Sequence, residues 1–174
     1  MKQVWTLKST LLALSLALAL PLAHAQAQPA TEVLPGMNES PMHDAARMGT
    51  RQDVEGLLKA SAQNRDVRTP LGASPLHYAA MNGDSGPLKA LLAAGANPNA
   101  RDTDGRTPLH MAAFTTRRDN TMLLLQAGAD PLLKTNDGRD VLSMARKVRA
   151  DEIAGEISLW ILKGCKPGKP VKGC

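Results

Sequence analysis

Aromatic side chains are scarce in this sequence of 174 residues, which has one Phe, one Tyr and two Trp. So few rings exclude a core built around buried aromatics, and they exclude a nucleic-acid surface on which bases stack against rings. The apolar content, 43% of the residues, must come from Ala, Leu and Met, which favour helices. At this length we expect one small domain, preceded by a targeting segment.

A long apolar run occurs near the N-terminus. Residues 11–22 read LLALSLALALPL, follow two lysines, and precede small residues that a signal peptidase accepts. This pattern predicts a secretory signal peptide over residues 1–25, cut after Ala25, or alternatively after Ala27. The run is shorter than the roughly 20 residues that span a bilayer, so we expect no stable membrane anchor. The mature protein is expected in a bacterial periplasm or outside the cell, beginning with a flexible linker over residues 26–38.

Cysteine is also scarce, since the chain has only Cys165 and Cys174. Both lie in the tail, residues 163–174, which carries four lysines and no acidic residue. In an oxidising compartment we expect the two cysteines to form one disulfide, which closes the tail against the last helix. The lysines are interpreted as a solvated terminus, with an anionic partner as the alternative.

Four segments of the chain repeat at a nearly constant spacing. Ser-Pro-Met-His at 40–43 recurs as Ser-Pro-Leu-His at 74–77 and Thr-Pro-Leu-His at 107–110, and in degraded form as Asp-Val-Leu-Ser at 140–143. The steps are 34, 33 and 33 residues, and a glycine lies two residues before each of the last three segments. A sustained period near 33 indicates stacked supersecondary units.

The second unit illustrates how each repeat is built. A Ser-Pro pair starts a helix that runs through residues 77–82 and ends at Gly83, a residue suited to a left-handed turn. A second helix over residues 87–94 carries three leucines toward a core and ends at Gly95. The polar stretch 97–105 that follows predicts a projecting loop or hairpin.

These motifs resemble the ankyrin repeat family, whose signature is Thr-Pro-Leu-His-x-Ala. The match is close in residues 107–113 and 91–99, and it extends over residues 39–162. The resemblance implies an all-α solenoid of about four repeats, each a helix-turn-helix pair with a projecting hairpin loop, with divergent repeats as terminal caps. In the last repeat Arg146 replaces a small Ala, while Asp140 still supplies a helix cap.

Three histidines are the first candidates for chemistry, because His43, His77 and His110 occupy the same position in successive repeats. Neighbouring units in a stack lie about 10 Å apart, whereas a shared zinc needs each nitrogen within about 2 Å. We therefore expect no metal site. The resemblance implies that the rings instead hydrogen-bond to the backbone of neighbouring loops.

Catalytic motifs are missing as well. The sequence has no Gly-x-Ser-x-Gly elbow, no HExxH and no phosphate loop, and its repeats contain no cysteine. Carboxylates that could form an acid–base pair or bind calcium lie at repeat-phased loop positions, where Asp commonly fixes turns. They are Asp102, Asp104, Asp130 and Asp137. We expect no enzyme and no cofactor, and the near-neutral repeats and the export signal argue against nucleic acid.

With metal binding, catalysis and nucleic-acid binding disfavoured, protein binding is the function that we expect. In proteins similar to this one, partners meet the concave face, which loop tips and the exposed side of each first helix form. Carried over by position, this face consists of Arg47, Met48, Met81, Asn82, Thr103, Asp104, Arg106, Phe114, Thr115, Asn136, Asp137 and Arg139. Lys147 and Val148 hold the same helix positions in the last repeat. An apolar row along it is expected at Met48, Met81, Phe114 and Val148, with packing on neighbouring helices as an equal alternative. Tyr78 and Met111 are interpreted as core residues.

The function expected from these features is that of a monomeric, non-enzymatic protein interaction module. It would act in the periplasm and bind one protein partner, which it stabilises or neutralises. The alternative is a secreted effector that engages a host or competitor protein.

Overall fold

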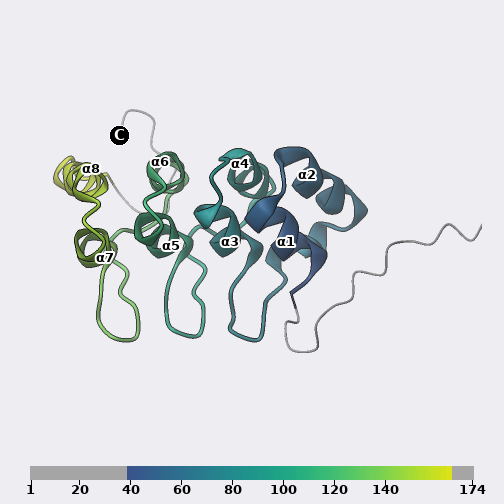
Figure 1. Cartoon of the computed structure of the whole chain (residues 1–174), viewed down its shortest axis with the longest axis horizontal. Coiled ribbons are helices and arrows are strands. Elements are labelled where there is room, and N and C mark those ends of the chain that lie inside the picture. The colour runs from purple at the N-terminus through teal and green to yellow at the C-terminus, as the bar shows by residue number, and fades with distance from the viewer. Residues whose placement is uncertain (1–38, 166–174) are drawn as a thin grey trace, which may run out of the picture. The chain divides into compact units, whose positions relative to one another are not determined.

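The computed structural model describes residues 39–165 of the chain (Figure 1). This part contains eight α-helices, one 3₁₀ helix and no β-strand. The odd-numbered helices form one row and the even-numbered helices a second row, and hairpin loops project from the first row (Figure 1). The predicted all-α solenoid is confirmed. The elements are α1 (Pro41–Met48), α2 (Arg51–Ala60), η1 (Ala62–Asp66), α3 (Pro75–Met81), α4 (Gly86–Ala93), α5 (Pro108–Phe114), α6 (Arg118–Gln126), α7 (Val141–Lys147) and α8 (Asp151–Leu162).

Helices of the first row begin at a cap that the repeat motif builds. In α3 the backbone N–H of Ser74 donates to Nδ1 of His77 over 3.1 Å, and the Ser74 hydroxyl lies 2.9 Å from the same nitrogen. Equivalent contacts start α1 and α5. In α7 the Asp140 carboxylate caps the helix, because its Oδ1 accepts the backbone N–H of Ser143 at 2.8 Å. The repeated motif therefore starts every helix of this row.

Small residues allow the helices of the first row to approach each other. Ala46, Ala80 and Ala113 are equivalent positions of the first three repeats, and all three are inaccessible to solvent. Arg146, their equivalent in the fourth repeat, is exposed, because no further helix of this row follows α7 within the described residues. In the second row, the burial of each leucine such as Leu91 contributes about 1.5–3 kcal/mol to the free energy of folding.

The prediction that Gly83 ends its helix in the left-handed conformation is wrong. Helix α3 ends at Met81 because Asn82 is extended, with φ −62° and ψ 144°. The Asn82 side-chain amide donates to two carbonyls at the end of α1, at 3.1 and 3.2 Å. The left-handed conformation occurs instead at the equivalent positions of the next two repeats, Thr116 (φ 57°) and Arg149 (φ 58°). For the β-branched Thr116 this conformation is strained.

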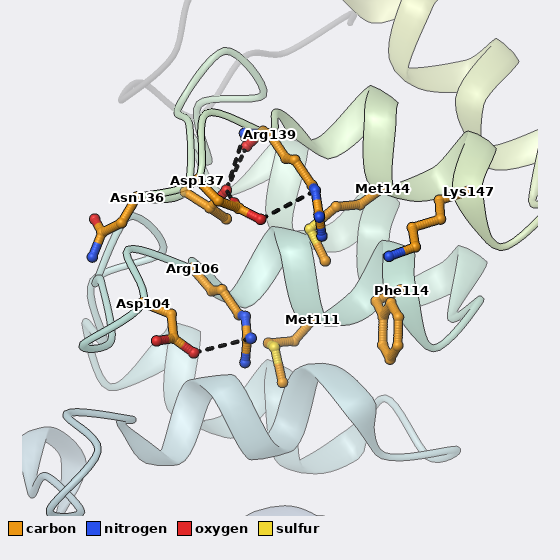
Figure 2. Close-up of a pocket in the computed structure, with 10 residues that line it drawn as sticks. Asp104, Arg106, Met111, Phe114, Asn136, Asp137, Arg139, Met144 and Lys147 are labelled. Atoms are coloured by element: carbon orange, nitrogen blue, oxygen red, sulfur yellow. Dashed lines mark hydrogen bonds and ion pairs between the residues drawn. The ribbon is translucent and has the colours of Figure 1, made fainter.

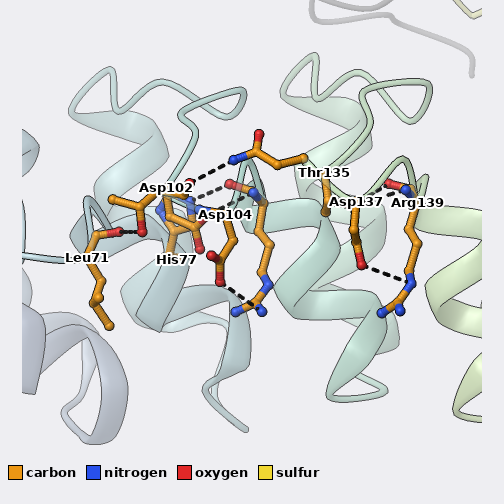
Figure 3. A network of polar contacts seen from close by, with 10 residues as sticks. Leu71, His77, Asp102, Asp104, Thr135, Asp137 and Arg139 are labelled. Atoms are coloured by element: carbon orange, nitrogen blue, oxygen red, sulfur yellow. Dashed lines mark hydrogen bonds and ion pairs between the residues drawn. The ribbon is translucent and has the colours of Figure 1, made fainter.

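Hairpin loops connect each helix pair to the next, and adjacent hairpins are hydrogen-bonded to each other (Figure 3). The N–H of Thr103 donates to the carbonyl of Leu71 at 3.0 Å, and the N–H of Asn136 donates to the carbonyl of Asp104 at 2.8 Å. Each turn contains a glycine with positive φ, a conformation that glycine adopts without steric cost. These glycines are Gly72 (71°), Gly105 (75°) and Gly138 (80°).

Helix α8 ends the described stack. Its Ile157 and Trp160 are buried, and Cys165, which is 8% exposed, packs with the same core. The expected partner of Cys165, Cys174, lies outside the described residues, so the disulfide stays a prediction. The predicted signal peptide with its cut and the linker over residues 26–38 also lie outside them. Among the helices of residues 39–165, none has the length and apolar character of a membrane span.

The close contact between hairpins makes one glycine more sensitive than another. A Cβ added at Gly105 would lie 3.0 Å from the backbone nitrogen of Asn136, whereas a Cβ at Gly138 would meet no atom within 4 Å. Both substitutions to Ala carry the cost of a positive φ, about 1 kcal/mol. Gly105→Ala also separates the hairpins and weakens a hydrogen bond worth about 1 kcal/mol. Urea unfolding should show a larger loss of stability for Gly105→Ala than for Gly138→Ala; equal losses would contradict this account of the hairpin contact.

Candidate functional site

A groove of about 480 Å³ lies where two hairpins meet helices α5 and α7 (Figure 2). Hairpin residues form one side, and side chains of the two helices form the other (Figure 2). We call it the charged groove. It is lined by Asp104, Arg106, Met111, Phe114, Thr135, Asn136, Asp137, Arg139, Met144 and Lys147.

The repeat period explains this composition. Asp104 and Arg106 at one hairpin tip correspond to Asp137 and Arg139 at the next. On the helices, the corresponding pairs are Met111 with Met144 and Phe114 with Lys147. Because equivalent residues lie on the same face of a solenoid, two successive repeats supply the same set of positions to one groove.

Each arginine of the charged groove is paired with an acid of its own hairpin. Arg106 lies 2.9 Å from the Asp104 carboxylate, and Arg139 lies 3.1 Å from that of Asp137 (Figure 2). The pKa of Asp137 is lowered, mainly because the Thr135 hydroxyl donates to its carboxylate and also because Arg139 is close. Asp137 therefore remains ionised at neutral pH and neutralises Arg139.

The helix side of the groove is apolar except for Lys147. Met144 is 8% exposed and Met111 is half-buried, whereas Phe114 is 49% exposed. A large exposed aromatic beside two methionines gives a surface that can adapt to irregular apolar side chains.

A second, smaller groove of about 130 Å³ continues from the first between α3 and α5. We call it the apolar groove, because Leu71, Ala73, Tyr78 and Met81 occupy the positions that Asp, Arg, Met and Phe occupy in the next repeat. Leu71 is 71% exposed. The two grooves share three lining residues, Asp104, Arg106 and Met111.

Most of the residues expected on the concave face line these grooves. Met81 and Thr103 line the apolar groove, and Phe114, Asn136, Asp137 and Arg139 line the charged groove. Asp104 and Arg106 line both. The structure therefore brings eight of the twelve predicted residues together.

Four predicted residues lie outside both grooves: Arg47, Met48, Asn82 and Thr115. Asn82 binds carbonyls of the preceding repeat, as described above, and the Thr115 hydroxyl donates to the Met111 carbonyl at 2.8 Å. Arg47 lies 3.2 Å from Glu39 and 2.8 Å from Asp44. These three side chains are engaged within the protein, while Met48 is 76% exposed.

The expected apolar row is also corrected. Met48 and Val148 are one position later in the repeat than Met81 and Phe114, so the four residues do not share one register. The residues equivalent to Met81 and Phe114 are Arg47 and Lys147. Of the four residues expected in the row, Met81 and Phe114 line one of the two grooves, and Met48 and Val148 line neither.

Two side chains interpreted as core have a double role. Tyr78 and Met111 pack against the core and also line the grooves. Burial raises the pKa of Tyr78 to about 12, and its hydroxyl donates to Glu39 at 2.8 Å. Met144 was not predicted, although a shift of 33 residues from Met111 finds it. Lys147 was expected on the exposed side of its first helix from its repeat position, and it lines the charged groove.

The histidines that recur in the first three repeats stabilise the fold, because each ring caps the start of its own helix. Nδ1 of His77 accepts the N–H of Ser74, so Nε2 carries the proton and donates to the Arg106 carbonyl of the next hairpin at 3.1 Å. Nε2 of His43 and of His110 has no hydrogen-bond partner of good geometry within the described residues. The expected ring-to-loop hydrogen bond is thus seen at His77. Residues 39–165 contain no cluster of His, Cys, Asp and Glu that could hold a metal ion.

Comparison with known families agrees with this architecture. Residues 42–135 match the family model of ankyrin repeats, in three copies. The match covers more than half of the chain, which belongs to the ankyrin repeat family. Ankyrin repeats are in general protein–protein interaction modules. No curated protein matches the chain.

The buried histidines predict how stability depends on pH. Burial lowers the pKa of His43, His77 and His110 below the ordinary value of 6.5, so the unfolded chain binds protons more readily than the folded one. Their contribution is complete above about pH 6.5 and is lost as the pH falls through the lowered pKa values. In a chain that begins at residue 26, the unfolding free energy in urea should decrease from pH 6.5 to 5, by at most about 1.4 kcal/mol per pH unit for each ring.

The control for this titration is the variant His77→Gln, which lacks one of the three buried rings. Its unfolding free energy should be lower at pH 7 but should fall less steeply on acidification. A stability that is constant between pH 6.5 and 5, or a variant with an unchanged slope, would show that the rings do not govern this dependence.

Proposed function

We propose that this protein is a non-enzymatic interaction module that binds a protein partner through the charged and apolar grooves. It acts as a monomer in the bacterial periplasm, after its signal peptide has been removed, and it stabilises or neutralises the partner. The observation that carries the proposal is the continuity of the two grooves, which hairpin tips and first-row helices form together.

Exposed apolar side chains in these grooves support binding of a protein. Leu71 and Phe114 are 71% and 49% exposed, and both lie beside polar hairpin residues that can hydrogen-bond to a backbone. Burying such a side chain contributes about 1.5–3 kcal/mol. Hot spots of protein interfaces have this arrangement, an apolar or aromatic anchor surrounded by polar groups.

The polar groups of the grooves support binding rather than catalysis. Asp104 and Asp137 each face an arginine, and their position at the hairpin tips is fixed by the turn. His77 lines the apolar groove, but both of its ring nitrogens contact the backbone or the Ser74 hydroxyl. These side chains are engaged in holding the hairpins, which favours a rigid binding surface.

A double variant tests the proposal. Met81→Asp with Phe114→Asp places a charge on the apolar part of each groove, without touching a fully buried residue. We expect capture of the partner from periplasmic extract, measured by crosslinking and mass spectrometry, to be lost, while the circular dichroism of the helices is unchanged.

The matched control is Leu132→Asp with Leu159→Asp. These leucines are 60% and 57% exposed and line neither groove. The control should capture the partner as the wild type does. Undiminished capture by the folded groove variant would refute the proposed binding face.

A further inference from the structure

One cation of the charged groove has no acid of its own. Arg106 and Arg139 are paired with Asp104 and Asp137, whereas Lys147 takes part in no ion pair or hydrogen bond among the described residues. Lys147 is exposed and lines the groove. The two carboxylates and three cations leave this groove with one excess positive charge, located at the lysine.

The surroundings of this lysine are apolar. Figure 2 shows Lys147 beside Phe114, at the end of the groove away from Asn136. On α7, Met144 precedes Lys147 by three residues, so the two side chains share one helix face, about 5–6 Å apart at their Cβ atoms. Met111 and Phe114 have the same spacing on α5. The site therefore places a cation next to an apolar surface.

We propose, building on the proposed function, that the charged groove binds an extended peptide segment of the partner with an acidic side chain and a bulky apolar side chain two residues apart. In an extended chain, residues i and i+2 point the same way and lie about 6.5–7 Å apart. This distance is about 1 Å longer than the Cβ spacing of Met144 and Lys147, a difference that the long, flexible lysine side chain can span. The acidic side chain pairs with Lys147, and the apolar side chain packs on Met144, Met111 and Phe114.

The same groove selects against other anionic partners. Arg106 and Arg139 at its hairpin end are already paired with Asp104 and Asp137, so a polyanion such as nucleic acid would find no second free cation in the groove. A basic segment would find both carboxylates already paired and would be repelled by Lys147. One acid next to one apolar side chain satisfies the free cation and the apolar surface together.

The test is selection of peptides from a phage-displayed random 12-residue library on the chain beginning at residue 26. Four proteins are compared: the wild type, Lys147→Glu, Arg146→Glu, and the double variant Met81→Asp with Phe114→Asp. Arg146 is the matched control, because it is the exposed neighbour of Lys147 on α7, carries the same charge, and does not line the groove.

The wild type and Arg146→Glu should enrich Asp or Glu two residues from a large apolar residue. Selection on Lys147→Glu should instead enrich Lys or Arg at the peptide position where the wild type selects Asp or Glu. A selected peptide should bind Lys147→Glu at least about tenfold more weakly than Arg146→Glu, and its acid-to-amide version should bind the two variants equally.

The remaining outcomes separate this inference from the proposed function. Peptides without an acidic preference that are lost on the double variant would overturn the acidic pairing and leave the binding face intact. Peptides retained by the double variant would contradict both. No enrichment on the wild type would overturn the extended peptide as the occupant, while the capture experiment above still tests the binding face. Binding of the chain to vesicles of anionic phospholipid that Lys147→Glu abolishes would assign the lysine to a lipid surface and overturn the peptide.

Discussion

Contact between successive first-row helices is the constraint on which this structure depends. A single repeat is too thin to enclose a core, so each unit buries its apolar face only against the next unit. Ala46, Ala80 and Ala113 allow this contact, and within the described residues the row ends at α7, where Arg146 takes their place. Because each unit must present the same faces to its neighbours, the position of a residue within the repeat decides where it lies on the whole stack.

Function can therefore change without any change of fold. The turn glycines, the caps and the small alanines hold the stack, whereas the hairpin tips and the last turns of the first-row helices carry different side chains from one repeat to the next. Leu71 and Ala73 give the apolar groove one apolar hairpin beside the hairpin of Asp104 and Arg106, whereas the charged groove has an Asp and an Arg from both of its hairpins. Residues that hold adjacent hairpins together thus also set the chemistry that a partner meets.

Repeat phase made the fold and most of the candidate site predictable from the sequence. It located the helices, the glycines of the hairpin turns and eight groove residues, because equivalent positions of successive repeats lie at equivalent places in the stack. Contacts between repeats could not be found in this way. Gly83 does not adopt the expected left-handed conformation, because the Asn82 side chain donates to carbonyls of the preceding repeat and Asn82 itself is extended. The left-handed conformation occurs at Thr116, the equivalent position of the next repeat. Likewise, the free charge at Lys147 emerges only when the arginines are seen to be paired.

The central claim is that the grooves are the surface that meets a partner in the cell. Photo-crosslinking tests it most directly, with p-benzoylphenylalanine at position 114 inside the charged groove, and at position 132 as a somewhat more exposed site outside both grooves. Irradiation of cells that produce the full-length chain should give a discrete protein adduct from position 114 and none from position 132. An adduct from position 132 alone, or none from position 114, would contradict the account.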